Sequence, residues 1–493
     1  EPYRQTILAQ EFVRYVGEPV AVVFARDAYV AEDIADLVNV EIEPLPAITS
    51  ALDEPGEFAP GLNTEPTITR KEFGDLRAAF RDAHAVIELE LKIGRHSGVP
   101  METRGAIARH DAVRDVLELH GATKRPHPNR DMIARLLGRS PSSVHCYECH
   151  IGGGFGVRGE LYPEDILVCV AALKLGRPVK WIEDRRENLM ACNHSREQVH
   201  RVRAAIDADG RVLGLDDEFF HDQGAYVRTH GTRVAEGTAS TLPGPYLIPA
   251  FRAVGHYRLT NKTPAATYRS PGRFESTFVH ERVMDAIATK LGVDPIEIRR
   301  RNLVPHAQMP YQRPMSGLGA PVVLDSGDYA AHLDKVLERV DWNHLRAEVT
   351  RRQKAGEAVG LGLAYFLEKS GQGPLEGVRL TVDASGTVEL VTAAASLGQG
   401  VETSLAQICA DGLGVDYRKV RVIHGRTDMI DYGFGANAAR VTIMVGSATH
   451  IAALKMREKA LAIAAEDFLE ATPEQLDIID GVIVRNDRSD APS

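Results

Sequence analysis

Cysteine is scarce in this sequence. Its 493 residues include only five cysteines, which is too few for a disulfide scaffold of this size. We therefore expect reduced thiols and a cytoplasmic setting. The five are Cys146, Cys149, Cys169, Cys192 and Cys409.

Long hydrophobic runs and an excess of positive charge are also missing. No apolar run approaches the roughly 18 residues of a membrane-spanning helix, and no signal peptide is visible. The formal net charge is −10 and the isoelectric point lies near 6.0, which argues against a nucleic-acid-binding surface. We therefore expect neither a membrane span nor a nucleic-acid partner. The first residue is Glu1 rather than methionine, which suggests a fragment or a processed chain.

The length suggests about three domains, or two large ones. Residues 1–75 have the pattern of a small α/β unit, in which two apolar strands flank an amphipathic helix. The strands are predicted at residues 19–24 and 38–42, and the helix at residues 28–37.

Two longer regions follow, at residues 83–306 and 307–493. Their strands and helices are mixed without a regular βαβ rhythm, so we expect an α+β fold with several mixed sheets. In the first region we predict strands at residues 85–93, 143–151, 199–206 and 212–220, and helices at 163–175 and 278–291. In the second we predict strands at 360–367, 378–382 and 387–393, and helices at 328–340, 402–413 and 447–469.

The most distinctive stretch is GGGFG at residues 152–156, between a predicted strand and a predicted helix. Glycines there expose backbone N–H groups, and the N-terminus of the following helix favours an anion. The single large residue, Phe155, would form a wall beside the ligand. A phosphate-bearing or pterin-like cofactor fits this pattern.

The same stretch fits the dinucleotide-binding pattern G-x-G-x-x-G through Gly154, Gly156 and Gly159. An NAD-dependent dehydrogenase is therefore an alternative. Two features argue against it. The helix is predicted to begin only at Pro163, several residues after the last glycine, and the region contains hairpins instead of a doubly wound series of strands.

Cys146 and Cys149 form a C-x-x-C pair flanked by His145 and His150, which could be a metal site. No second cysteine pair is available to complete a tetrahedral site. We therefore favour small core residues for both cysteines, and the same for Cys409 in an apolar helix stripe.

Three further stretches are rich in small residues. SLGQGVE at residues 396–402 places a glutamine between two glycines before a predicted helix, which suits phosphates or the amide edge of a heterocycle, although a plain strand–helix turn is equally possible. YGFGANAAR at residues 432–440 is the second. YRSPGR at residues 268–273 contains Arg269 and Arg273, which could bind an anion or an oxo group or form structural ion pairs.

Taken together and in this order, these stretches resemble the molybdenum-cofactor-binding large subunit of the xanthine dehydrogenase, aldehyde oxidase and carbon monoxide dehydrogenase family. The ordered set spans nearly the whole chain and is more specific than any one stretch, which weakens the NAD alternative. The matching segments are VGEPVAVV at 16–23, PMETRG at 100–105, GGGFG at 152–156, WIEDR at 181–185, DQGAY at 222–226, YRSPGR at 268–273, GQG at 398–400 and YGFG at 432–435.

The resemblance implies a domain layout and a chemistry. A small α/β hammerhead-like domain at residues 1–75 would precede two mixed α+β molybdopterin-binding domains at 83–306 and 307–493, the second incomplete. Molybdenum would be held by the dithiolene of a molybdopterin, in bacteria usually the cytosine dinucleotide, without a direct protein ligand. Oxygen from water would be added to an aldehyde or an N-heterocycle. Electrons would pass to [2Fe–2S] clusters on a small subunit and to FAD on a medium subunit.

The resemblance also assigns site residues in this sequence. The cofactor-binding set is Gly153, Gly154, Phe155, Gly156, Arg269, Gly398, Gln399, Gly400, Ala438 and Ala439. The substrate-pocket set is Lys124, Glu236, Glu368 and Lys369.

Three departures from the family pattern bear on the expected chemistry. Lys124 stands where the family usually has a glutamine beside the molybdenum oxo group, and its charge would shift the proton chemistry there. Ser270 replaces the copper-binding cysteine of carbon monoxide dehydrogenases, which argues against CO oxidation. Gly159 stands at the position of the substrate-facing glutamate of purine hydroxylases, with Glu160 one residue away, which argues against a purine.

The catalytic glutamate of the family, in a Gly-Glu motif near the C-terminus, is not found in this sequence, so we assign no catalytic residue. We expect a molybdenum hydroxylase polypeptide that is incomplete alone. The missing segment would belong to a further chain, or the sequence would be an incomplete piece of a longer chain. A degenerate, non-catalytic scaffold is the other alternative.

Overall fold

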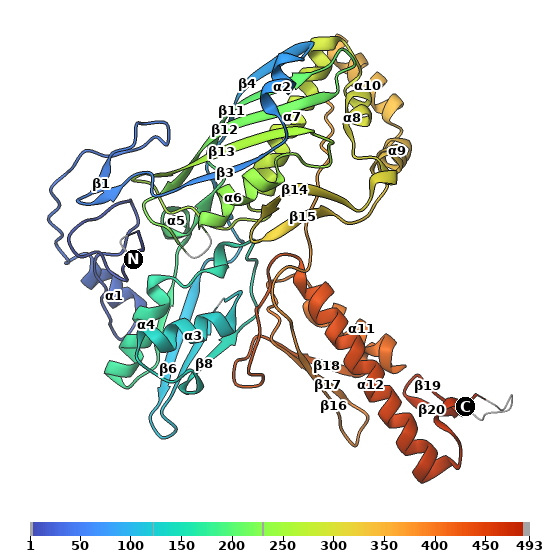
Figure 1. Ribbon diagram of the computed structural model, residues 1–493. Helices are drawn as coiled ribbons and strands as arrows, with labels where there is room; N and C mark the ends of the chain where they lie inside the picture. Colours follow the sequence, from blue (N-terminus) through green and yellow to red (C-terminus); the bar gives the residue numbers. More distant parts are fainter. Residues whose placement is uncertain (1–2, 122, 229–230, 487–493) are drawn as a thin grey trace. The chain divides into compact units, whose positions relative to one another are not determined.

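The computed structural model describes residues 3–121, 123–228 and 231–486 (Figure 1). The chain folds into two compact units, each of which combines separate segments of the sequence. Both units mix strands and helices, which confirms the α+β class. Unit 1 comprises residues 1–5, 44–97 and 193–368, and unit 2 comprises residues 6–43, 98–192 and 369–493.

Unit 1 is built on a five-stranded sheet with the strand order β3-β13-β12-β11-β4, whose strands lie side by side in Figure 1. β11 and β12 form the predicted antiparallel hairpin, whereas β12 and β13 are parallel. The strands are β3 (Ile68–Phe73), β4 (Ala85–Ile93), β11 (Gln198–Ile206), β12 (Val212–Gly224) and β13 (Ala250–Leu259).

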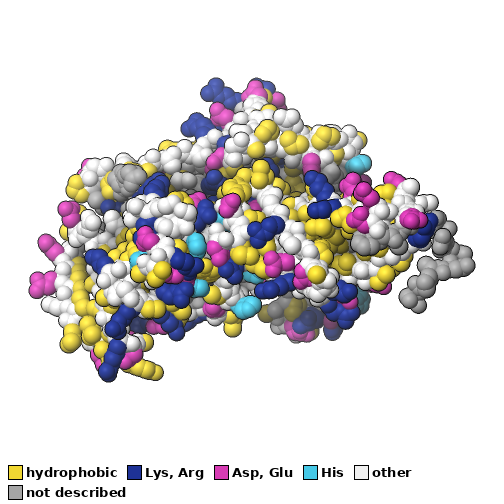
Figure 2. Space-filling view, turned by 90° about the horizontal axis from the view of Figure 1, so that it is seen from below, with side chains coloured by type: hydrophobic (Ala, Val, Ile, Leu, Met, Phe, Trp, Pro, Cys, Tyr) yellow, Lys and Arg dark blue, Asp and Glu magenta, His cyan; other side chains and the backbone are white. Residues whose placement is uncertain are grey.

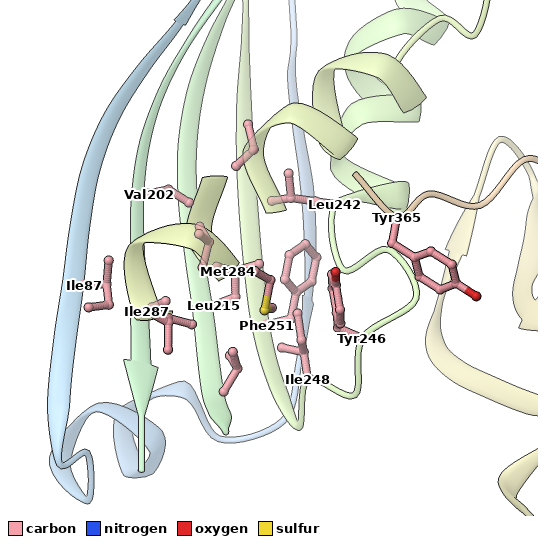
Figure 3. Packing of buried hydrophobic residues seen from close by; sticks show 14 of the residues in the cluster. Ile87, Val202, Leu215, Leu242, Tyr246, Ile248, Phe251, Met284, Ile287 and Tyr365 are labelled. Carbon is pink, nitrogen blue, oxygen red and sulfur yellow. The ribbon is translucent and has the colours of Figure 1, made fainter. Parts of the chain in front are cut away.

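The core of unit 1 lies between this sheet and the helix α7 (Arg273–Leu291). Alternation along β4 and β12 turns Ile87 and Leu215 toward the helix, and the helical repeat places Met284 and Ile287 on the facing side of α7. Figure 3 shows these apolar side chains packed together. The amphipathic pattern of the sequence therefore accounts for this core.

Smaller elements complete unit 1, and α6 packs against β13, β3 and α7. They are β1 (Glu57–Ala59), β2 (Leu62–Asn63), α2 (Leu76–Arg81), β5 (His96–Ser97), β10 (His194–Ser195), α6 (Gly231–Thr241), α8 (Pro295–Asn302), β14 (Tyr311–Gly317), β15 (Ala320–Leu324), α9 (Tyr329–Arg339) and α10 (Trp342–Lys354).

Unit 2 contains a four-stranded sheet with the order β8-β7-β6-β9. β7 and β8 are parallel, while β6 is antiparallel to both of its neighbours. α3 packs on β8, and α4 packs on β6 and β9. The elements are β6 (Gly105–Asp111), β7 (Val116–Gly121), α3 (Pro126–Leu136), β8 (Val144–Glu148), α4 (Pro163–Leu175), β9 (Val179–Ile182) and α5 (Arg185–Ala191).

A second sheet of unit 2, β16-β17-β18, carries α11 and α12. Its buried core includes Leu390, Leu405 and Cys409, as the apolar stripe of the predicted helix requires. The elements of this part are β16 (Val378–Val382), β17 (Val388–Thr392), α11 (Val401–Leu413), β18 (Val420–Ile423), α12 (Gly446–Ala464), β19 (Leu476–Ile479) and β20 (Val482–Arg485). The N-terminal helix α1 (Ala28–Ala35) also belongs to unit 2.

Three predicted strands are not formed. Residues 19–24, 38–42 and 360–367 have no strand partner in the described part of the chain, and most of their side chains are exposed. Apolar alternation alone does not make a strand, because the backbone also needs a neighbouring ladder. The helix at residues 28–37 is present as α1, but none of its residues is buried.

Charges of both signs are interspersed on the face shown in Figure 2. Within the described part of the chain, no helix combines the length and the apolar composition that crossing a bilayer requires.

Candidate cofactor-binding site

The glycine-rich loop at residues 151–156 joins β8 to the segment before α4 in unit 2. Its backbone is left-handed at Gly153 (φ 103°), Phe155 (φ 49°) and Gly156 (φ 115°). Glycine adopts such angles without steric cost, but a bulky residue does so only under constraint. Phe155 is 44% exposed. A strained aromatic residue that faces outward is typical of ligand-binding loops.

A second loop, at residues 396–400, lies against the glycine-rich loop. A Cβ atom at Gly154 would be 2.8 Å from Cδ1 of Leu397, and one at Gly398 would be 3.3 Å from the carbonyl oxygen of Ile151. Side chains at these positions would push the loops apart. The glycines therefore allow two backbones to approach closely.

The glycine-rich loop offers backbone donors that have no acceptor in the described part of the chain. Gly154 and Gly156 are buried, and no described group accepts a hydrogen bond from their amides or from those of Gly153 and Phe155. A buried amide without a partner costs about 1–3 kcal/mol. A ligand with acceptor atoms, such as a pterin edge or a phosphate, fits this array.

Gln399 lies at the tip of the second loop, in front of α11, and is exposed. Its Oε1 accepts a hydrogen bond from the Leu397 N–H at 2.5 Å, and its Nε2 donates to the Ala395 carbonyl at 3.0 Å. The side chain therefore braces its own turn. Gly398 (φ 95°) and Gly400 (φ 75°) supply the left-handed positions that the turn needs.

The turn at residues 432–440 packs against the segment that holds Lys124. A Cβ atom at Gly435 would overlap the carbonyl oxygen of Lys124, and the Ala436 N–H donates to the same oxygen at 3.1 Å. Ala438 and Ala439 are both left-handed, with φ of 49° and 48°. Non-glycine residues in this conformation carry backbone strain, which is common at ligand-binding turns.

Lys124 links this turn to the residues just after the glycine-rich loop. Its N–H donates to the Arg158 carbonyl at 3.2 Å, and its Nζ lies 3.3 Å from the position of a Cβ at Gly159. Lys124 is buried, and burial lowers its pKa to about 8 while the neighbouring Glu160 opposes that shift. Gly159 thus leaves room for a lysine that titrates close to neutral pH.

A cavity of about 20 Å³ lies near Lys124, between Thr123, Arg158 and Asp165. It is large enough for one water molecule and far too small for a cofactor. Burial raises the pKa of Asp165 to about 6. This cavity is a structural feature of the unit rather than the binding site.

Sequence reasoning missed a chain of three side chains beneath the two loops. His424 Nδ1 lies 3.0 Å from Glu148 Oε2, and His424 Nε2 lies 2.8 Å from Glu402 Oε1. Burial raises the pKa of Glu148 to about 7. Burial opposes protonation of His424, but the two carboxylates outweigh it and raise its pKa. Residue spacing gave no signal, because the three residues come from three distant segments.

Arg269 lies in unit 1, in the turn before α7, and is exposed. The buried Arg196 supports this turn by donating to the carbonyls of Arg269 and Ser270. Arg196 also pairs with Glu275 at 3.2 Å, and aromatic rings flank its guanidinium at 4.3 and 4.6 Å. Ser270 is left-handed (φ 55°).

Glu368, predicted for the substrate pocket, is bound to the same turn. Its carboxylate pairs with Arg273 at 3.0 Å and accepts a hydrogen bond from the Ser270 hydroxyl at 2.9 Å. Glu368 therefore lies beside the turn that carries Arg269. Lys369 is exposed and belongs to unit 2.

Glu236 lies on α6 in unit 1 and is half-buried. Its Oε1 accepts hydrogen bonds from the Leu318 N–H at 2.9 Å and from Lys71 Nζ at 3.4 Å. These contacts give Glu236 a structural role in unit 1.

The expectation that both cysteines of the C-x-x-C pair are core residues is wrong for one of them. Cys146 is buried within β8, whereas Cys149 lies past the end of the strand and is exposed. Among the residues that the structure describes, no three His, Cys, Asp or Glu side chains are grouped as they would be around a metal ion.

The dinucleotide-binding alternative is not supported. A 3₁₀ turn, Val157–Gly159, follows the glycine-rich loop, and α4 begins only at Pro163. The sheet of this region is largely antiparallel. A Rossmann unit has parallel strands and a helix that begins at the glycines.

Comparison with known proteins gives consistent matches. Profiles described as molybdopterin cofactor-binding domain match residues 60–303 and 335–492. The 6-hydroxypseudooxynicotine dehydrogenase complex subunit gamma of Paenarthrobacter nicotinovorans is 40% identical over 484 residues, which is 98% of this chain and 61% of that protein. The carbon monoxide dehydrogenase large chain of Hydrogenophaga pseudoflava is 31% identical over 506 residues, which is 96% of this chain and 62% of that protein.

Among solved structures, quinoline 2-oxidoreductase from Pseudomonas putida 86 matches with a TM-score of 0.90 at 34% identity, covering 98% of this chain and 63% of that chain. The fold and the loops thus define a molybdopterin-binding protein. The chain belongs to the xanthine dehydrogenase, aldehyde oxidase and carbon monoxide dehydrogenase family of molybdenum-binding large subunits, as the resemblance implied. It spans about three fifths of the length of these relatives.

Proposed function

We propose that the loops at residues 151–156 and 396–400, together with the turn at residues 432–440, form the cofactor-binding site of a molybdenum hydroxylase. This enzyme would oxidise an aldehyde or an N-heterocycle with oxygen from water. The observation that carries the proposal is the contact between the loops at residues 151–156 and 396–400. Glycines let the two loops meet, and the amides of residues 153–156 have no acceptor among the described residues. The bound cofactor would supply two-electron oxidation at its molybdenum.

Backbone and side-chain groups of unit 2 support this role. The amides of residues 153–156 would donate to acceptor atoms of the pterin, and Phe155 would wall the site. The N-terminus of α11 favours a phosphate, which supports the cytosine dinucleotide form. Ala438 and Ala439 leave space beside the cofactor. Lys124 would hold a proton that burial makes easy to release near pH 8.

Four further site residues are proposed on the family resemblance. Arg269 would contact the pterin side of the cofactor. Glu368 would line the substrate pocket, and its bond to Ser270 supports a place beside Arg269. Glu236 and Lys369 are assigned to the substrate pocket on the family resemblance alone.

We favour an N-heterocycle over an aldehyde, because two relatives are named for quinoline and for a nicotine derivative. A relative that is a subunit of a dehydrogenase complex supports partner subunits, which we propose to carry [2Fe–2S] clusters and FAD. We propose no catalytic residue among these 493 residues. Five free cysteines support a cytoplasmic setting.

The matches at residues 60–303 and 335–492 support two successive molybdopterin-binding domains, which we place at 83–306 and 307–493. The hammerhead-like domain at residues 1–75 rests on the family resemblance.

The test is metal analysis and pterin fluorescence of the protein purified from a host that makes the cofactor. We expect molybdenum and pterin in equal amounts, and less of both when Gly154 is replaced by valine. Cofactor-free protein from such a host would favour the non-catalytic scaffold. Protection of residues 154–159 from hydrogen exchange by added NAD would restore the dehydrogenase alternative.

A further inference from the structure

The chain Glu148–His424–Glu402 connects three segments of unit 2. Glu148 is the last residue of β8 and leads into the glycine-rich loop, Glu402 lies in the first turn of α11, and His424 directly follows β18. The Glu148 side chain is fully buried, and that of His424 is 14% exposed. Neither of these two side chains is among the cofactor-binding residues assigned above.

The same carboxylate also holds the second loop directly. Glu148 Oε2 accepts a hydrogen bond from the Ser396 N–H at 2.9 Å, in addition to the bond with His424. The Ser396 hydroxyl donates to Glu402 Oε2 at 3.0 Å. Both ends of the His424 contact therefore converge on the first residue of the 396–400 loop.

The backbone is built around this contact. The Glu148 N–H donates to the Gly425 carbonyl at 2.8 Å, and the Gly425 N–H donates to the Ala394 carbonyl at 3.0 Å. Gly425 is left-handed (φ 62°), and a Cβ atom there would overlap the Glu148 side chain. The glycine after His424 is thus required for the carboxylate to sit where it does.

The chemistry of the contact makes it strong. An imidazole has a hydrogen-bond donor at both nitrogens only when it is protonated. Because each nitrogen of His424 faces a carboxylate oxygen, both nitrogens are satisfied by an imidazolium between two carboxylates, or by one proton shared with a carboxyl group. Charge-assisted bonds of this kind are about twice as strong as neutral ones.

We propose that His424 is a positioning residue that, through Glu148 and Glu402, holds the glycine-rich loop and the 396–400 loop at the spacing a bound cofactor requires. The proposal rests on the proposed function of these loops. His424 would touch neither cofactor nor substrate, and its effect would reach the site through the two loops.

The test is hydrogen exchange of peptides covering residues 149–159 and 393–400, measured on His424→Phe, on Glu402→Gln and on the unaltered protein. The Ser396 amide is a direct reporter because it donates to Glu148. The matched control is His110→Phe, since His110 pairs with one carboxylate at 2.9 Å near the opposite end of the sheet. Molybdenum and pterin content are measured on the same samples.

We expect exchange about tenfold faster in both peptides of His424→Phe, a smaller increase in Glu402→Gln, and no change in His110→Phe. Wild-type exchange in His424→Phe would overturn the proposal, whatever the cofactor content. Faster exchange with no pterin in any sample would support the loop-holding role and overturn the proposed function. If His424→Phe unfolds the unit, Glu402→Gln decides, because Glu402 is 41% exposed and its replacement is expected to disturb the packing less.

Discussion

The turn that carries Arg269 in unit 1 and the glycine loops of unit 2 are held in different ways. In unit 1, one buried arginine side chain binds two backbone carbonyls of the turn and one buried carboxylate. In unit 2, glycines leave room for close contacts at Gly154 and Gly398, in addition to the side-chain contacts of His424. The turn in unit 1 depends on one buried charge, whereas the loops of unit 2 also depend on the small volume of their glycines.

This difference determines which substitutions each region tolerates. Removal of a buried charge leaves its partner uncompensated in a poorly hydrated place. Addition of a methyl group at a close backbone contact instead forces the chains apart. The two regions should therefore respond to opposite kinds of change, charge removal in unit 1 and added volume in unit 2.

The largest effect is expected for Arg196→Met in unit 1. The change leaves Glu275 as a buried carboxylate without its cation and frees the carbonyls of Arg269 and Ser270. We expect a loss of about 3–5 kcal/mol in the free energy of unfolding, measured by urea unfolding. The control is Arg211→Met, whose partner Asp209 is exposed. Equal effects of the two changes would show that Arg196 does not hold the turn.

The next effect is expected for Gly435→Ala in unit 2. The new methyl group would overlap the Lys124 carbonyl, and the position is left-handed (φ 75°). Strain and overlap together should cost about 3 kcal/mol. Gly386→Ala is the matched control, because Gly386 is also left-handed (φ 81°) but has open space around it. A loss for Gly435→Ala no greater than that for Gly386→Ala would mean that volume is not what limits this contact.

Much of this arrangement could be predicted from the sequence, and the limits have physical reasons. The glycine stretches predicted the loops, because glycine adopts left-handed backbone angles that other residues rarely adopt. The strand at 85–93 and the helix at 163–175 matched their bounds. Strands at 19–24 and 38–42 failed because pairing depends on neighbours that a local pattern does not contain.

The side-chain contacts around the candidate site were harder to predict from the sequence than the loops themselves. Nothing near His424 in the sequence indicates Glu148 and Glu402, and nothing near Arg196 indicates the turn at 269–273. Contacts between distant segments are fixed by the fold, so residue spacing could not reveal them. The contacts of Glu236 with Lys71 and with the Leu318 N–H likewise join distant segments, and its place in the substrate pocket stays a prediction.

A smaller effect, which depends on pH, is expected for Lys124. Its pKa is about 8 in the folded chain, below the usual 10.5, so between these values the unfolded chain binds more protons. The folded state should therefore gain about 2 kcal/mol between pH 8 and pH 10. Lys124→Met should lose this gain in urea unfolding, while Lys174→Met, at an exposed lysine, should keep it. Identical pH profiles for Lys124→Met and the unaltered protein would contradict a buried, easily deprotonated amine.

The smallest effect is expected for Gln399→Ala, and it tests how much the Gln399 side chain adds to the support of the 396–400 loop. The change removes the bonds to the Leu397 N–H and the Ala395 carbonyl without adding volume. Because Gln399 is exposed, water can replace both bonds, so we expect a loss of only about 1 kcal/mol, seen as about fivefold faster exchange of the Leu397 amide. Gln353→Ala, which removes an exposed bond to the Val359 carbonyl, is the control for a loop without a proposed ligand. If Gln399→Ala leaves exchange unchanged but lowers pterin content, the side chain binds the cofactor directly. If Gln399→Ala speeds exchange of the Leu397 amide and lowers pterin content by a similar factor, the Gln399 side chain acts only by bracing its own loop. That role is smaller than the one expected for Arg196 in unit 1.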